Sequence, residues 1–151
     1  MTPITVLIAD HEKARRAVCL RLLEPEEGIR VIGEARTDLE AVTATIKLKP
    51  RILLLGLNLL KGKHDALLMT LRQKSPQTRV ILLTGRSQEA GIVEALSHGS
   101  RGYLEEKVLA TFLPKAVRCV DAGEAWVPRK MVARIIERLA SLTAKSQERL
   151  S

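Results

Sequence analysis

The sequence predicts an α/β protein built on a doubly wound, five-stranded parallel sheet. Short β-rich runs alternate five times along the chain with segments whose apolar residues have helical spacing. The stretch 51–60, RILLLGLNLL, follows Pro50 and lacks an amphipathic period, so it should hold the central strand, buried on both faces. The core must be aliphatic, because 46% of the residues are hydrophobic and only 2% are aromatic.

The first half of the chain reads as strand, helix, strand, helix and the central strand. The polar residues 10–12 separate the first strand from a helix whose apolar stripe we expect at Ala14, Val18 and Leu22. Thr37-Asp38-Leu39-Glu40 has the form of a capping box and opens a second helix that ends before Pro50. The expected elements are strands at 5–9 and 30–35, a helix at 14–23, and a second helical stripe at Leu39, Val42 and Ile46.

The second half continues the alternation and adds one further helix. Ser87 is expected to cap the fourth helix, and Pro114 is acceptable only in the first turn of the fifth, which Gly123 ends. The expected strands are 79–84 and 101–105, and the expected helices are about 66–74, 87–97, 112–122 and 129–140.

Chain length predicts a single domain, and cysteine usage predicts reduced thiols. A chain of 151 residues suits one domain with a tail. No stretch approaches the roughly 20 apolar residues of a membrane span, and the N-terminus lacks a leader pattern, so we expect a cytoplasmic protein. Cys19 and Cys119 form no disulfide framework or zinc spacing, and we expect reduced, buried thiols on the first and fifth helices.

The positive charge does not by itself predict a nucleic-acid groove. The formal net charge is +8, and residues 129–151 hold six Lys or Arg against two Glu. Half of the excess therefore lies in the last helix and tail, which has no interleaved aromatic residues and reads as a solvated basic face.

The last predicted helix carries an apolar stripe that five strands and five helices leave without a partner. It should cover an edge of the domain or contact another chain, and a homodimer formed through it would suit a regulator of paired DNA half-sites. The stripe is Met131, Val132, Ile135, Ile136 and Leu139.

Five motifs in this order closely resemble a bacterial response-regulator receiver domain, which has a flavodoxin-like fold. They are VLIADH at 6–11, VIGEA at 31–35, LLLGLNL at 53–59, VILLT at 80–84 and SRGYL at 100–104.

The later part of the chain resembles one subfamily of these regulators. AGEAWVPR at 122–129 is similar to the LuxR/NarL-type transcriptional regulators, in which a helix-turn-helix domain that binds DNA follows the receiver. The segment 142–150 resembles the opening of that second domain. We therefore assign 1–127 to the receiver and 128–151 to a C-terminal helix and linker, and we expect the chain to be cut from a longer protein or to end naturally there, the former being favoured.

The resemblance implies a phosphorylation site at the carboxyl ends of the strands. In the family, a carboxylate after the third strand attacks a phosphoryl group, and that carboxylate and an acidic pair after the first strand hold Mg²⁺. A Thr after the fourth strand and a Lys after the fifth bind the phosphoryl oxygens.

This chain departs from that pattern at most positions. Asp10 matches the first acid of the pair, but His11 stands at the second and Gly56 stands at the nucleophile. Thr84 matches the phosphate-sensing hydroxyl and Tyr103 the switch aromatic. At the Lys position the count gives Glu106, and Lys107 comes one residue late, pointing to the other side of an extended segment.

Glycine cannot act as a nucleophile, so the resemblance implies a degenerate receiver, or pseudo-receiver, that is not phosphorylated at Gly56. With one oxygen ligand left, we expect no cofactor and weak or absent Mg²⁺ binding. Lys61, Lys63 and His64 could add positive charge at the rim, and Asp65 or Asp38 could be modified instead.

Each residual site residue also has a plain structural interpretation. Asp10 could cap the first helix, and His11 could be an exposed loop histidine. Thr84 could bond to the local backbone, and Tyr103 could be a half-buried strand aromatic.

The leading functional hypothesis is a non-enzymatic signal receiver that regulates transcription through a LuxR-type DNA-binding domain outside this chain. A stand-alone pseudo-receiver is the alternative; it would act by dimerisation or by docking a protein partner, in place of a histidine kinase, around Thr84 and Tyr103. A flavodoxin-like nucleotide binder is the third hypothesis, but residues 10–13 lack the glycines and hydroxyls that cradle phosphate.

Overall fold

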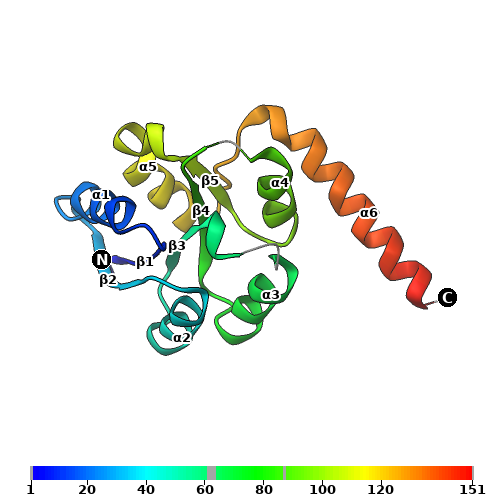
Figure 1. The fold of residues 1–151 in the computed structure, drawn as a ribbon, viewed down its shortest axis with the longest axis horizontal. Helices are drawn as coiled ribbons and strands as arrows, with labels where there is room; N and C mark the ends of the chain where they lie inside the picture. Colours follow the sequence, from blue (N-terminus) through cyan, green and yellow to red (C-terminus); the bar gives the residue numbers. More distant parts are fainter. Residues whose placement is uncertain (1, 61–63, 87, 151) are drawn as a thin grey trace.

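The computed structural model describes residues 2–60, 64–86 and 88–150 and confirms a flavodoxin-like fold (Figure 1). All strands of the sheet are parallel, in the order β2-β1-β3-β4-β5. The strands are β1 Ile4–Ala9, β2 Ile29–Ala35, β3 Ile52–Gly56, β4 Arg79–Thr84 and β5 Gly102–Glu105. The α-helices are α1 Lys13–Leu23, α2 Asp38–Leu48, α3 His64–Lys74, α4 Glu89–Ser97, α5 Leu109–Asp121 and α6 Val132–Leu150, and short 3-10 turns are η1 Leu57–Leu59, η2 Glu106–Val108 and η3 Arg129–Met131.

The central strand β3 is buried on both faces, as the sequence predicts. Because side chains alternate along a strand, Leu53 and Leu55 enter the core beneath α2, α3 and α4, whereas Ile52 and Leu54 enter the core beneath α1 and α5. The parallel sheet therefore brings the ends of β1, β3, β4 and β5 to one edge, where a site can form.

The expected apolar stripes of α1 and α2 are only partly right, since Val18 and Leu22 of α1 pack partly against the core. On α1, Ala14 is exposed, and the buried residues include Arg15, Arg16 and Cys19. On α2, Leu39 is 73% exposed and Ile46 37%, whereas the smaller Ala41 and Thr45 face the sheet; of the predicted stripe only Val42 packs partly on the core. Small residues allow α2 to lie close to the sheet, and burial follows packing rather than hydropathy alone.

The start of α2 follows the predicted capping pattern in part. The Thr37 hydroxyl accepts the Glu40 N–H at 3.1 Å, as an N-cap should. The Glu40 carboxylate accepts the Arg36 N–H at 2.7 Å, one residue before the position that a full capping box would use.

Two further helix starts differ from expectation. The helix α5 begins at Leu109, so Pro114 lies in its interior and not in the first turn, and the Ala110 carbonyl loses its usual bonding partner. The residue before α4 is Gln88, whose side chain makes no capping hydrogen bond, while Ser87 falls outside the described residues.

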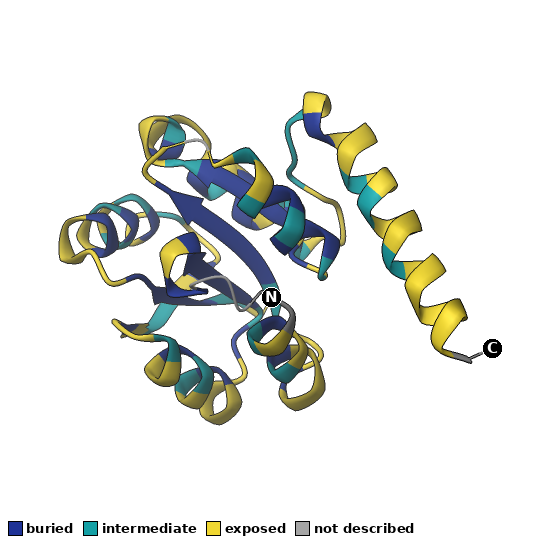
Figure 2. Cartoon of the chain, turned by 45° about the vertical axis from the view of Figure 1, so that its right-hand side comes forward, coloured by how far each residue is buried: buried dark blue, intermediate teal, exposed yellow. Residues whose placement is uncertain are grey.

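The helix α6 runs to Leu150, ten residues beyond the predicted end, and lies against α4 (Figure 1). Arg138 donates two hydrogen bonds to Glu94, at 2.8 and 2.9 Å, and Arg134 pairs with Glu89 at 2.7 Å. Residues 143–149 are exposed on every side (Figure 2). In the described ranges, no helix is long and apolar enough to cross a membrane.

The predicted stripe on α6 divides into two faces. Met131, just before the helix, is 1% exposed, and Ile135 packs partly on the same core. Val132, Ile136 and Leu139 are 44%, 60% and 44% exposed. One face thus covers the domain edge, and the other remains open.

The two cysteines lie on neighbouring helices, but only one is buried. Cys19 is enclosed beneath α1, and burial raises the pKa of its thiol to about 12. The expectation for Cys119 is wrong, because this residue is partly exposed and donates to Glu124 Oε2 at 3.0 Å, which raises its pKa.

Replacing Met131 with Ala should detach the start of α6 from the core. We expect the free energy of unfolding to fall by about 2–5 kcal/mol, the usual cost of truncating a buried methionine. Urea denaturation of dilute protein measures it. Ile136→Ala is the matched control, since truncating an exposed residue should change stability by no more than about 0.5 kcal/mol. Equal effects of the two changes would contradict this packing.

Candidate functional site

The candidate site lies at the carboxyl edge of the sheet, where four strands end side by side. Asp10 follows β1, Gly56 ends β3, Thr84 ends β4, and Glu106 follows β5. The structure thus brings together most of the positions that the sequence singles out.

The carboxylate of Asp10 is fully buried and already bonded on both oxygens. Oδ1 accepts the Glu12 N–H at 2.9 Å, and Oδ2 accepts Arg15 Nη1 at 2.8 Å. Arg16 Nη1 donates to the Asp10 backbone carbonyl at 2.7 Å. The expectation that Asp10 caps the first helix is wrong, because the N-cap of α1 is Glu12 and no side chain caps this end. Asp10 instead holds the loop before the helix and forms a buried ion pair with Arg15.

Gly56 makes room for this carboxylate. A Cβ atom at position 56 would lie 2.8 Å from both Cγ and Oδ2 of Asp10, closer than van der Waals contact allows. The backbone at Gly56 has φ −60° and ψ 126°, which any residue adopts readily. The missing side chain, not the conformation, is therefore what the site requires of this glycine.

The guanidinium of Arg15 connects the loops around the site. Besides Asp10, its Nη2 lies 3.2 Å from Glu12 Oε2 and 3.8 Å from Glu106 Oε2. A Cβ at Gly85 would lie 2.8 Å from the same Nη2, so a second glycine leaves space for this group. Burial lowers the pKa of Arg15, whereas Asp10, Glu12 and Glu106 raise it; the net direction is upward, and Arg15 stays charged.

The Thr84 hydroxyl is turned toward its own loop. It donates to the Arg86 carbonyl at 2.6 Å and accepts the Arg86 N–H at 3.3 Å. Thr84 is buried, and this local bonding matches its plain structural interpretation.

Tyr103 is buried rather than half-buried. Only 5% of it is exposed, and it lies in the core beneath α3 and α4. Its hydroxyl donates to Glu105 Oε1 at 2.8 Å. This bond and the Lys107 ammonium, 3.2 Å from Glu105 Oε2, lower the pKa of Glu105.

Two predicted residues lie at the rim or outside it. His11 has about half of its side chain exposed, with Nδ1 3.6 Å from Asp10 Oδ1. Lys107 is 78% exposed, and its segment forms the turn η2 and not an extended strand, so the expected geometry there is wrong.

The structure describes only some of the residues proposed as alternative phosphoryl acceptors or as a basic rim. Asp38 begins α2, and its Oδ1 accepts the Leu39 N–H at 2.9 Å. Lys61 and Lys63 and the side chains of His64 and Asp65 lie outside the described residues.

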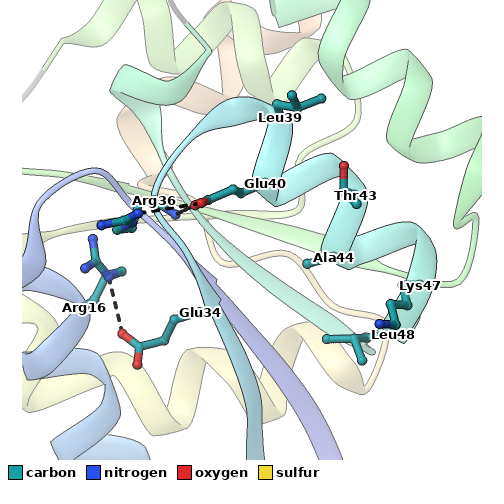
Figure 3. Close-up of a pocket in the computed structure, with 9 residues that line it drawn as sticks. All are labelled: Arg16, Glu34, Arg36, Leu39, Glu40, Thr43, Ala44, Lys47 and Leu48. Atoms are coloured by element: carbon teal, nitrogen blue, oxygen red, sulfur yellow. Dashed lines mark hydrogen bonds and ion pairs between the residues drawn. The ribbon is translucent and has the colours of Figure 1, made fainter.

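A groove of about 720 Å³ lies beside the site, between β2 and α2 (Figure 3). Arg16 links it to the site, since its Nε lies 3.3 Å from Glu34 Oε1 while its Nη1 reaches Asp10. Leu39 and Leu48 contribute apolar surface to the groove. Arg16 pairs there with Glu34, and Arg36 pairs with Glu40. The chemistry inferred from the sequence lies at Asp10 and Gly56, outside this groove.

The sheet order and the residues gathered at its carboxyl edge define a receiver-type α/β domain. Residues 6–118 match the response regulator receiver domain family, so the chain belongs to that family.

Named relatives and a solved structure agree with this assignment. The chain is 28% identical over 145 residues to the DNA-binding transcriptional activator DevR/DosR of Mycobacterium tuberculosis, covering 96% of this chain and 66% of that protein. It is 30% identical over 122 residues to the nitrate/nitrite response regulator protein NarL of Escherichia coli, covering 81% and 56%. The isolated receiver domain of RcsB from Salmonella enterica superposes with a TM-score of 0.76 at 24% identity, covering 89% and 98%.

Sequence reasoning missed Arg15, Arg16 and Gly85. Charged residues within a helix are usually exposed, and these arginines break the apolar pattern of α1. The one available signal is that Arg15 follows Asp10 by five residues, within reach of a carboxylate at the start of the helix.

Gly56→Ala should be costly although alanine fits the backbone. The new Cβ forces the Asp10 carboxylate to move, and we expect a loss of about 1–3 kcal/mol in the free energy of unfolding. In an Asp10→Ala background the same change should cost less, which a double-mutant cycle by urea denaturation measures. Gly91→Ala is the control, because its Cβ would meet only an ordinary contact at 3.7 Å. Equal tolerance of alanine at positions 56 and 91 would refute the close fit.

Proposed function

We propose that this protein is a signal receiver that works without phosphorylation at the third-strand position. The observation that carries the proposal is at Gly56. The Asp10 carboxylate lies so close to this residue that a side chain at position 56 would clash with it. Phosphoryl transfer to a receiver needs a carboxylate oxygen as nucleophile, and position 56 offers none.

The other groups near Gly56 support the same proposal. Asp10 is completely buried, and both of its oxygens are engaged, so it is a poor substitute acceptor. The Thr84 hydroxyl is bonded within its own loop, and Glu106 carries negative charge where a lysine would attract a phosphoryl group. Like charges would repel the incoming phosphate.

We further propose that the output is control of transcription through a LuxR-type DNA-binding domain in the full-length protein, and that the module is not an enzyme. The chain spans between 56% and 66% of the length of the relatives named above, one of which is a DNA-binding transcriptional activator. The alternative, a stand-alone pseudo-receiver that docks a partner protein, rests on the same altered site.

Dimerisation through α6 is the assembly that the exposed stripe supports. Val132, Ile136 and Leu139 are spaced along one side of the helix, and the side that carries Arg134 and Arg138 is already engaged with α4. A second copy could bury this stripe against its own, by two-fold symmetry.

Acetyl phosphate with Mg²⁺ should leave the intact mass of the protein unchanged, because no carboxylate stands at position 56. A receiver domain with aspartate at that position, treated in parallel, is the positive control for mass spectrometry. A gain equal to one phosphoryl group would overturn the proposal, and Asp38→Asn would then show whether Asp38 had accepted it.

Ile136→Glu should convert a dimer into a monomer, because it places a charge in the centre of the apolar stripe. Size-exclusion chromatography with light scattering measures the mass in solution. Ala133→Glu adds the same charge at an exposed position outside the stripe and should leave the dimer intact. A monomeric wild-type chain, or equal loss of the dimer in both variants, would contradict the assembly.

A further inference from the structure

Three acidic side chains at the site, Asp10 among them, lie around the guanidinium of Arg15. Arg15 lies within ion-pair distance of three carboxylates, from Asp10, Glu12 and Glu106. These acids come from the loop after β1 and the turn after β5. Arg15 is 3% exposed, so its positive charge is held inside the site.

The residues present do not fit the Mg²⁺ ion that the family implies. Mg²⁺ prefers octahedral coordination by oxygen, usually with one or two carboxylates free to bind it. Asp10 is the buried carboxylate that remains, and its two oxygens bond to the Glu12 N–H and to Arg15. Among the residues described, no three or more His, Cys, Asp or Glu side chains are grouped to hold a metal ion.

We propose that the Arg15 guanidinium is a permanent internal cation that takes the place of a divalent metal ion at the carboxyl edge of the sheet. It neutralises Asp10 and joins the loop after β1 to the turn after β5. These loops are thereby held in one arrangement without metal or phosphate.

Two glycines support this replacement. The absence of a side chain at position 56 leaves room for the Asp10 carboxylate, and the absence at position 85 leaves room for Arg15 Nη2. Each Cβ would approach one member of the pair to 2.8 Å. A side chain at position 56 would clash with the Asp10 carboxylate that pairs with Arg15. The absence of a nucleophile there and the presence of the arginine are therefore coupled both sterically and electrostatically.

Arg15 is not completely satisfied in this position. Its buried Nε has no hydrogen-bond partner among the residues that the structure describes. An unpaired buried donor is unfavourable, so the attraction of the carboxylates must offset it. The buried Asp10 at 2.8 Å contributes most, because Glu12 and Glu106 are both 44% exposed.

The inference deepens the proposed function. Its importance for signalling rests on that function, whereas the role of Arg15 at the strand ends does not. The two can fail separately. Phosphorylation by acetyl phosphate would overturn the proposed function, whereas divalent-ion binding by the wild-type protein would overturn the role of Arg15.

Arg15→Met tests the replacement by removing the charge while keeping an apolar stem. The thermal unfolding midpoint is measured with and without roughly 10 mM MgCl₂, a concentration that saturates weak sites, against NaCl of matched ionic strength. We expect no Mg²⁺-specific shift for the wild type and a rise of several degrees for Arg15→Met, as Mg²⁺ takes over the freed carboxylates. Adding Asp10→Asn to Arg15→Met should abolish the rise.

Arg16→Met is the matched control. It removes an equal charge from the next position of α1, where Arg16 bonds the Asp10 carbonyl and Glu34 but leaves Arg15 in place. It should lower stability without creating a response to Mg²⁺. Arg15→Leu, which also removes the charge and every donor but has a shorter apolar side chain, serves as a second test variant if Arg15→Met folds poorly.

Three results would overturn the inference. The first is a Mg²⁺-specific, Asp10-dependent shift in the wild type. The second is an equal response of the Arg15 and Arg16 variants. The third is no response in either Arg15 variant, including failure of an unfolded variant to refold when Mg²⁺ is added.

Discussion

The buried ion pair between Asp10 and Arg15 is the interaction on which the rest of the site depends. Two charges removed from water are stable together only when they are close and well bonded, and losing one partner typically costs about 3–5 kcal/mol. The 2.8 Å contact and the Glu12 N–H satisfy Asp10. The pair also needs space, and Gly56 and Gly85 leave that space on its two sides.

This constraint separates the fold from the chemistry that the fold commonly carries. The parallel sheet still collects strand ends at one edge, as it must for any receiver. At these ends the Asp10 carboxylate bonds to the Glu12 N–H and to Arg15, and position 56 carries no side chain. Function depends on the side chains at the strand ends and not on the architecture alone.

The helix α6 gives the domain a second distinctive surface, away from this edge. Met131 and the arginine pairs to Glu89 and Glu94 hold the start of the helix against the domain. The remaining apolar positions face outward.

The sequence by itself determined the order of strands and helices along the chain, the central strand and the absence of a side chain at position 56, because these depend on local periodicity and on side-chain identity. Only the tertiary structure decided which helix faces are buried. Ala41 and Thr45 displaced Leu39 from the core because close packing favours small residues there. The structure alone also showed that Arg15 is buried. A charged residue is buried only where it meets a partner such as Asp10, and hydrophobic periodicity does not reveal such a partner.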